Sequence, residues 1–203
     1  MTCKLPQWLG IAVVLAAALN ASAQSTRVED LAIGKLLVAP RDSPDPIFAK
    51  TVILLVQHDD NGALGLIVNR RMKLPISRAL GQWKSAKDDS DPVYMGGPVE
   101  LDGVMALLRS AKAGDATHVF GDVYFAGSRK TMENALASGA GPHDFRIYLG
   151  YCGWGAGQLE HEVDVGAWYI FKANSALVFD SDPGSLWSRL IARIEQQVVL
   201  LHR

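Results

Sequence analysis

The chain has 203 residues, with 20 basic and 21 acidic side chains and a formal net charge of −1. Such a balance lacks the basic excess that nucleic-acid binding requires, so we expect no nucleic-acid partner. The length is enough for one well-buried core but not comfortably for two.

The first residues have the pattern of a secretory signal peptide. Lys4 supplies a positive charge, Trp8 to Leu19 are apolar or small, and Ala21-Ser22-Ala23 matches the small-x-small cleavage site. The apolar run is shorter than the roughly 20 residues of a membrane-spanning helix, so an uncleaved anchor is the weaker alternative. We therefore expect removal of residues 1–23 and a periplasmic or secreted protein, formed by residues 24–203 as a single domain without a stable membrane anchor.

A β-hairpin is the clearest element in the first part of the mature chain. Residues 25–34 predict a short helix, and Lys35–Ala39 predicts a first short strand. The β-branched, apolar run Thr51–His58 is typical of a buried central strand. Asp60-Asn61-Gly62 then favours a tight turn, after which Leu64–Asn69 returns as the partner strand.

The middle of the chain alternates short strands with helices. The pattern predicts helices at residues 75–82 and 128–138, a loop at 84–92, and strands at Val93–Met95, Val104–Leu108, Val119–Phe125 and Phe145–Tyr151. Strands in hairpin-like runs with irregularly placed helices indicate an α+β fold. We expect a mixed, mainly antiparallel sheet, curled or barrel-like, with helices packed outside.

The last part begins with a glycine-rich segment, residues 150–157. It is predicted to be a tight crossover leading into a short helix at Gly155–Val163. Strands are predicted at Ala167–Ala173 and Leu177–Phe179. A long amphipathic helix should follow Pro183, because apolar residues recur there at three- and four-residue spacing.

No segment carries a complete cofactor or metal motif, so we expect no cofactor and no metal. In the glycine-rich segment, Gln158 stands where a dinucleotide fingerprint needs its last glycine. Glu160 and Glu162 follow, and their charges would repel a phosphate, which makes packing a better explanation of the glycines than anion binding. His161 has no second histidine four residues away, as a zinc-binding helix would require.

Cys152 is the only cysteine that remains after the leader, with Cys3, is removed. No intramolecular disulfide can form, and a free cysteine is most often buried. The alternative is a thiol enzyme in which Cys152 is activated by one of the histidines at positions 58, 118, 143 and 161. No local signature of a cysteine or serine hydrolase supports that alternative, so no catalytic residue is assigned.

Three segments, taken in order, resemble the YqgE/AlgH family of bacterial proteins. They are Asp45 to His58 continuing through Gly62 to Arg70, then Gly96-Gly97-Pro98-Val99, and finally Leu149 to Glu160 followed by Trp168. The resemblance covers nearly all of the mature chain. It implies a barrel-like sheet flanked by helices. Some members of that family are described as regulators of transcription, notably of alginate production, without a recognisable DNA-binding motif.

This sequence departs from the family pattern by its leader, and by a cysteine at position 152 where a small residue is common. We expect an exported, non-enzymatic binding or regulatory module for an unknown ligand or protein. The alternatives are a cytoplasmic transcriptional regulator, if the leader is not real, and the thiol enzyme. The candidate binding surface lies between the hairpin end and the glycine-rich crossover and comprises His58, Asn69, Arg70, Gly97, Pro98, Gly153, Trp154, Gln158 and Glu160.

Overall fold

A computed structural model describes residues 26–87, 89–110 and 114–201, so the predicted leader lies outside the described residues. The strands are β1 Lys35–Val38, β2 Val52–Asp59, β3 Gly62–Ile67, β4 Arg71–Pro75, β5 Pro92–Met95, β6 Val99–Arg109, β7 Thr117–Phe120, β8 Val123–Ala126, β9 Phe145–Gly155 and β10 Tyr169–Lys172. The helices are α1 Ile76–Ala79, α2 Arg129–Ala137, α3 Gln158–Asp164, α4 Ser175–Val178 and α5 Pro183–Leu201, with short 3₁₀ turns at Val28–Asp30 and Lys84–Ala86.

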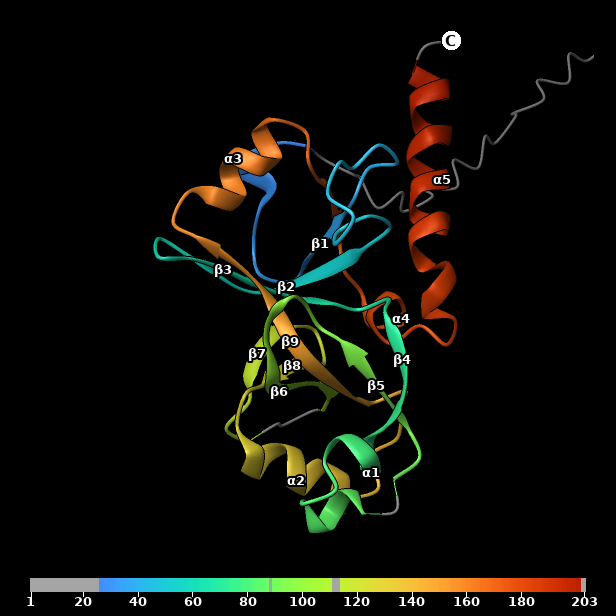
Figure 1. Ribbon diagram of the computed structural model, residues 1–203. Helices are drawn as coiled ribbons and strands as arrows, with labels where there is room; N and C mark the ends of the chain where they lie inside the picture. The colour runs from blue at the N-terminus through green and yellow to red at the C-terminus, as the bar shows by residue number, and fades with distance from the viewer. Residues whose placement is uncertain (1–25, 88, 111–113, 202–203) are drawn as a thin grey trace, which may run out of the picture.

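The ten strands form one curled sheet in the order β10-β1-β2-β3-β9-β6-β8-β7, with β4 joined through β5 to β9 (Figure 1). Of the strand pairs in the described residues, β5–β9 is parallel and the rest are antiparallel. The sheet curls until the Ser175 hydroxyl at the start of α4 donates to the Asp122 carboxylate in the β7–β8 turn. The predicted α+β class, with a mixed, mainly antiparallel and curled sheet, is confirmed.

The sheet separates three apolar clusters. Inside the curl, alternate residues of β1, β2 and β3 pack against α4 and α5. On the outer face of the same strands, the other set packs under α3, at the upper end of Figure 1. At the lower end, β5, β6 and β9 pack against α1 and α2. Because β2 supplies side chains to two of the clusters, Val52–Val56 is buried on both faces, as its continuous apolar run predicts.

The predicted β2–β3 hairpin is present, with its turn at Asp60–Asn61. Asp59 accepts a hydrogen bond from the Asn61 backbone N–H, 2.8 Å away, and Gly62 follows with φ of 137°. A side chain on Gly62 would lie 2.1 Å from the Trp154 carbonyl oxygen, because β3 and β9 approach closely there. Glycine is therefore required at this position both by the positive φ and by the close approach of β9.

The glycine-rich segment is not the predicted crossover, because residues 150–155 are the second half of strand β9. This half pairs with β3, with Cys152 opposite Gly65 and Gly155 opposite Gly62. Cys152 and Trp154 point into the apolar cluster under α3, so the segment keeps the two-residue period of a strand despite its glycines. The structure corrects our prediction here: the segment is extended, Gly150 lies against the backbone of Gly97 with φ of 68°, and Gly157 adopts a φ of 73° just before α3.

Two other predicted elements differ from the structure. The helix predicted at residues 25–34 is replaced, in the described part 26–34, by a 3₁₀ turn at Val28–Asp30. Leu177–Phe179, predicted as a strand, belongs to the short helix α4 and the residue after it. There the Asn174 side chain caps the helix by accepting from the Leu177 backbone N–H at 3.0 Å. An N-terminal cap three residues before an apolar triplet favours a helical turn over an extended strand.

One strand prediction was wrong, and one strand of the structure was not predicted. The predicted strand Val119–Phe125 is a hairpin, in which β7 and β8 are joined by a turn containing Gly121. Strand β4 was not predicted at all. Its residues alternate polar and apolar from Arg71 to Leu74, a short strand signal that was overlooked, and its pairing with β5 shifts register between Arg71 and Pro75. The short α1 begins directly after Pro75, close to the predicted start of that helix.

Helix α5 is present as predicted and stands along one side of the sheet (Figure 1). Its apolar stripe buries Trp187, Leu190, Ile191 and Ile194 against the inside of the curl. The Trp187 indole N–H donates to the Ala39 carbonyl oxygen at 2.7 Å, which fixes the helix to the end of β1. No helix among the described residues is both long and apolar enough to cross a membrane.

Candidate functional site

The candidate residues form two groups at opposite ends of β3. Near the β2–β3 turn lie His58, Gly153, Trp154, Gln158 and Glu160, beside α3. Beyond the other end of β3 lie Asn69, Arg70, Gly97 and Pro98. Six strand residues separate the two ends, which corresponds to about 20 Å. The structure therefore does not bring the predicted surface together as one site.

In the first group, Glu162 of α3 holds two tryptophan side chains. One carboxylate oxygen accepts from the indole N–H groups of Trp154, at 2.9 Å, and Trp168, at 2.8 Å. The other oxygen accepts from the Gln158 amide at 3.0 Å, and Gln158 in turn accepts from the Gly155 backbone N–H at 3.1 Å. The polar atoms of Trp154 and Gln158 are thus used within the fold, where they fasten α3 to β9.

His58 and Glu160 make a second link between the sheet and α3. The His58 Nε2 lies 2.6 Å from a Glu160 carboxylate oxygen, and both side chains are partly exposed. The hydrogen bond from His58 lowers the pKa of Glu160 below its usual range. Gly153 is exposed and lines a separate shallow hollow of about 310 Å³ at the hairpin end, with Gln57, Asp59 and Leu64. We assign the pair a positioning role for α3.

In the second group, Asn69 is a structural residue. Its carbonyl oxygen accepts from the Val52 backbone N–H and its amide donates to the Lys50 carbonyl oxygen, both at 2.9 Å. Asn69 is buried, so these two bonds replace the hydrogen bonds to water that it loses. They also hold Lys50 at a φ of 59°, in the left-handed region where non-glycine residues are uncommon. Asn69 therefore shapes the segment in front of β2.

Gly97 and Pro98 are set against the backbone of β9. The Gly96 carbonyl oxygen accepts from the Ile67 backbone N–H at 2.8 Å, and the Gly96 N–H donates to the Leu149 carbonyl oxygen at 2.8 Å. A side chain on Gly97 would lie 2.0 Å from the Tyr151 carbonyl carbon. Pro98, the next residue, is half-buried. The pair of glycines is needed for packing between β3, β5 and β9.

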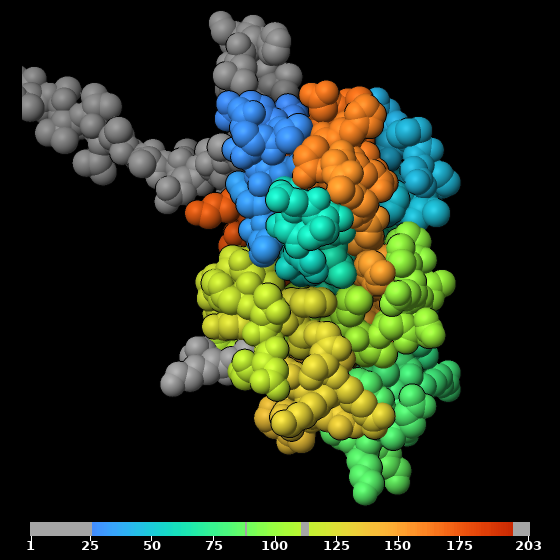
Figure 2. Space-filling view, turned by 90° about the vertical axis from the view of Figure 1, so that its left-hand side faces the viewer, coloured from blue at the N-terminus to red at the C-terminus, as the bar shows by residue number. Residues whose placement is uncertain are grey.

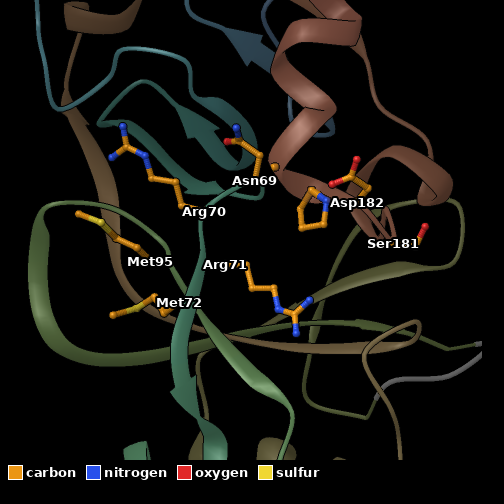
Figure 3. A pocket seen from close by; sticks show the side chains of 9 residues that line it. Asn69, Arg70, Arg71, Met72, Met95, Ser181 and Asp182 are labelled. Atoms are coloured by element: carbon orange, nitrogen blue, oxygen red, sulfur yellow. The ribbon is translucent and has the colours of Figure 1, made fainter.

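Arg70 borders a cleft, and within the described residues its guanidinium donates a single hydrogen bond, to the Ala49 carbonyl oxygen. The cleft has a volume of about 570 Å³ and lies between the start of β4 and the start of α5 (Figure 3). We call it the arginine cleft; it is lined by Asn69, Arg70, Arg71, Met72, Met95, Ser181, Asp182, Pro183 and Gly184.

The two arginines of the cleft point in different directions from neighbouring positions (Figure 3). Arg70 donates one hydrogen bond to the Ala49 carbonyl oxygen at 3.2 Å, and its partial burial lowers its pKa. Arg71 is exposed. Within the described residues, neither guanidinium forms an ion pair with a carboxylate, although Asp182 lines the opposite wall. On the side of β4 that faces α5, the cleft thus offers the Arg71 guanidinium, whereas the side chains of Arg70, Met72 and Met95 point to the other side of the strand (Figure 3).

Comparison with known proteins decides the family. A model described as AlgH-like matches residues 36–199. The chain belongs to the AlgH-like family. The UPF0301 protein CT0663 of Chlorobaculum tepidum is 36% identical over 166 residues, which are 80% of this chain and 87% of that protein. A UPF0301 protein of Pseudomonas aeruginosa is 36% identical over 170 residues, covering 81% and 89%.

Two solved structures have the same fold. The solution structure of the AlgH protein from Pseudomonas aeruginosa is 35% identical, covers 83% of this chain and 92% of its own, and superimposes with a TM-score of 0.67. A crystal structure of protein DIP2367 from Corynebacterium diphtheriae has a TM-score of 0.67 at 22% identity, covering 81% and 87%. The family resemblance read from the three sequence segments is confirmed.

Cys152 of this AlgH-like chain is placed where a nucleophile would be inactive. Its side chain is 1% exposed, and its thiol donates to the Gly96 carbonyl oxygen at 3.5 Å. Burial raises the pKa of Cys152 to about 12, although Arg70 opposes this shift. In the described residues, no three His, Cys, Asp or Glu side chains are grouped so that they could hold a metal ion.

We expect native protein at neutral pH to resist modification of Cys152 by a disulfide reagent such as DTNB. The reason is twofold: the sulfur is covered, and its raised pKa leaves almost no thiolate at neutral pH. The thiol should react at once in denaturant, which serves as the control. Rapid, stoichiometric labelling of the native form would contradict this placement and restore the thiol-enzyme alternative.

Sequence reasoning missed Arg71 and the segment Ser181–Gly184, which line the cleft. Arg71 follows the matched family segment by one residue and belongs to the unpredicted strand β4. Ser181–Gly184 precede a helix that was predicted, but nothing in their pattern indicates that they face β4. A doubled arginine at the end of a buried strand was the available signal.

Proposed function

We propose that this AlgH-like chain is a non-enzymatic binding module whose ligand site is the arginine cleft. The observation that carries the proposal is that, within the described residues, Arg70 and Arg71 form no ion pair with a carboxylate at a concave site of about 570 Å³. Guanidinium groups recognise carboxylate and phosphate through paired, charge-assisted hydrogen bonds. The ligand is therefore an anion of small-molecule size.

The rest of the candidate surface supports a non-enzymatic role. The polar atoms of Trp154, Gln158 and Asn69 are satisfied by partners inside the fold. The one thiol in the described residues is covered and protonated at neutral pH. A catalytic site needs a nucleophile or base within reach of a substrate. The arginine cleft contains neither a histidine nor a cysteine nor a lysine; its one acid is Asp182.

Calorimetric titration with pyrophosphate, used as a generic anion probe, tests the proposal. Arg71→Ala should weaken binding about tenfold, because a hydrogen bond to a charged group contributes roughly 1.5–3 kcal/mol. Arg78→Ala, which removes an exposed arginine from the neighbouring helix α1, is the matched control and should bind as the unmodified protein does. Equal affinities for all three proteins, or no binding by any, would refute the cleft as an anion site.

We further propose that the module works outside the cytoplasm. The support is the leader pattern of Lys4, the apolar run to Leu19, and Ala21-Ser22-Ala23. Fractionation of the expressing bacterium, followed by N-terminal sequencing, should find the protein in the periplasm or the medium with Gln24 as its first residue. Unprocessed protein in the cytosol would contradict export and favour the regulator of transcription.

A further inference from the structure

The inner face of the curled sheet is left open at the end of the β2–β3 hairpin. Helices α4 and α5 cover the apolar residues inside the curl, but beyond this cover Gln57, Asp59 and Leu64 are exposed or partly exposed. In Figure 2 the end of the hairpin, in turquoise, faces the viewer, with β9 in orange beside it. The hollow of about 310 Å³ lies here. We call it the hairpin hollow; its lining includes Gln57, Asp59, Leu64, Tyr151 and Gly153.

Strand pairing places these five residues on one face of the sheet. Gln57 stands opposite Leu64, and Leu64 stands opposite Gly153, so the three form a row across β2, β3 and β9. Tyr151 and Gly153 share this face, because side chains alternate along a strand and the two are two residues apart. Asp59 is two residues beyond Gln57, in the next row toward the turn. The hollow therefore has a polar side on β2 and an aromatic side on β9.

Between these two sides the floor of the hollow is backbone, because β9 carries glycines there. Gly153 is exposed, and a side chain on it would lie 3.1 Å from a Tyr151 ring carbon, so the ring lies against this glycine. Gly155, one row nearer the turn, has nothing within 4 Å of the position that an added methyl group would take. Glycines with open space above them let a flat ligand approach the backbone closely.

The polar side of the hollow has hydrogen-bond acceptors left for a ligand. Asp59 accepts from the Asn61 backbone N–H at 2.8 Å and from the Gln57 amide at 3.2 Å. These bonds lower the pKa of Asp59, so its carboxylate is charged at neutral pH, and within the described residues it forms no ion pair. No hydrogen bond in the described part of the chain uses the Gln57 amide oxygen.

This combination of groups matches the chemistry of a neutral sugar. A pyranose ring has a face of C–H groups, which packs on an aromatic ring, and a rim of hydroxyl groups, which donate to carboxylate and amide oxygens. The unpaired charge of Asp59 disfavours phosphates and carboxylates. A volume of about 310 Å³ is at the lower end of the range of roughly 300–1,000 Å³ for small-molecule sites, which suits a ligand of one ring.

We propose that the hairpin hollow binds a neutral pyranose sugar. The ring lies over Gly153 beside Tyr151, and two of its hydroxyl groups donate to the Asp59 carboxylate and the Gln57 amide oxygen. The proposal is independent of the arginine cleft, because the two sites lie at opposite ends of β3 and take ligands of different charge. The chain thus has two separate binding sites.

An NMR titration of ¹⁵N-labelled protein with simple glycosides tests the hairpin hollow. The probes are the methyl glycosides of glucose, galactose, mannose and N-acetylglucosamine, each added to about 50 mM, which saturates a site with a dissociation constant of a few millimolar. With at least one of them, the backbone amide signals of Leu64, Gly153 and Gly155 should shift and saturate together, while those of Ser181 and Gly184 in the arginine cleft stay unchanged. If none of the glycosides produced saturable shifts at the hollow, the proposal would be overturned.

Substitutions assign the binding to these side chains. Gln57→Ala should raise the dissociation constant about fivefold and Asp59→Asn about tenfold, since each loses a hydrogen bond and the second also loses its charge. Tyr151→Ala should raise it at least about fivefold, whereas Tyr151→Phe, which keeps the ring, should stay within about twofold. Gln82→Ala, at an exposed glutamine between α1 and the 3₁₀ turn that follows it, is the matched control. Should circular dichroism show that Tyr151→Ala misfolds, the two substitutions on β2 decide: affinities equal to that of the control would overturn the proposal.

Discussion

Gly97→Ala is expected to lower the melting temperature by at least about 10 °C, or to prevent folding. The new methyl group would lie 2.0 Å from the Tyr151 carbonyl carbon and 2.4 Å from the Cys152 nitrogen. These are backbone atoms of a strand paired on both edges, so they cannot rotate away as a side chain would. Overpacking usually costs 1–3 kcal/mol, and we expect the upper end or more. For a domain of this size, each kcal/mol lowers the melting temperature by roughly 2–4 °C.

Gly155→Ala is the matched control for this substitution. Gly155 lies in the same strand β9, and nothing is within 4 Å of the position that its added methyl group would take. Its melting temperature should stay within about 2 °C of the unmodified protein. If thermal unfolding followed by circular dichroism gave similar values for both variants, the close approach of Gly96-Gly97 to β9 would be wrong, and Gly97 would again be a candidate for binding.

Arg146→Met should destabilise the protein by about 3 kcal/mol in urea unfolding. Arg146 is 3% exposed and donates to three carbonyl oxygens, those of Pro142 at 3.0 Å, Val178 at 3.0 Å and Asp180 at 2.6 Å. Its guanidinium carbon also lies 4.8 Å from the Tyr94 ring centre. Methionine fills part of the space but leaves three carbonyl groups without a donor, each costing about 1 kcal/mol or more.

Arg109→Met provides the comparison, because Arg109 is a partly exposed arginine on neighbouring strand β6. It pairs with Asp122 at 2.8 Å and with Asp144 at 3.5 Å. Surface ion pairs typically contribute 0–1 kcal/mol, so its loss should change stability little. If the Arg146→Met variant were as stable as Arg109→Met, the hydrogen bonds from Arg146 to the carbonyl oxygens between α4 and α5 would not stabilise the fold as we claim. The same hydrogen bonds, to Val178 and Asp180, hold the chain just before Ser181, which lines one wall of the arginine cleft.

The parts of the fold that could be predicted from sequence are those in which one local pattern determines the structure. The run Val52–Val56 is buried on both sides, and the turn residues Asp60–Gly62 follow it directly, so the hairpin needs no tertiary information. Helix α5 has a regular apolar stripe over several turns. In both cases propensity, period and capping or turn chemistry agree.

The errors arise where tertiary contacts override a local signal. Glycines at 150–155 suggest a turn when only the chain itself is considered. In the fold Gly150 permits β9 to pass close to the backbone of Gly97 and Val99, whereas Gly155 has nothing near it. Strand β4 is held by its partner β5 across a shifted register, and its own signal is only the four-residue alternation from Arg71 to Leu74. Pairing partners distant in sequence decide such strands.

The candidate site was predicted only in part, for a related reason. Residue type shows that Trp154, Gln158 and Glu160 carry polar atoms, but not that Glu162 and His58 satisfy them. Arg70 was among the candidate residues and lines the cleft, whereas its neighbour Arg71 was not among them, because it lies outside the family segments. Only the folded structure distinguishes a donor already used internally from one that is left for a ligand.

An NMR titration of ¹⁵N-labelled protein with pyrophosphate tests the arginine cleft most directly. The Nε–H signals of Arg70 and Arg71 and the backbone amides of Ser181, Asp182 and Gly184 should shift and saturate together, since all five residues line the cleft. The indole N–H signals of Trp154 and Trp168 should not shift, because both N–H groups already donate hydrogen bonds to the Glu162 carboxylate. Saturable shifts of the indole signals with unchanged arginine signals would contradict the assignment and place the site beside α3.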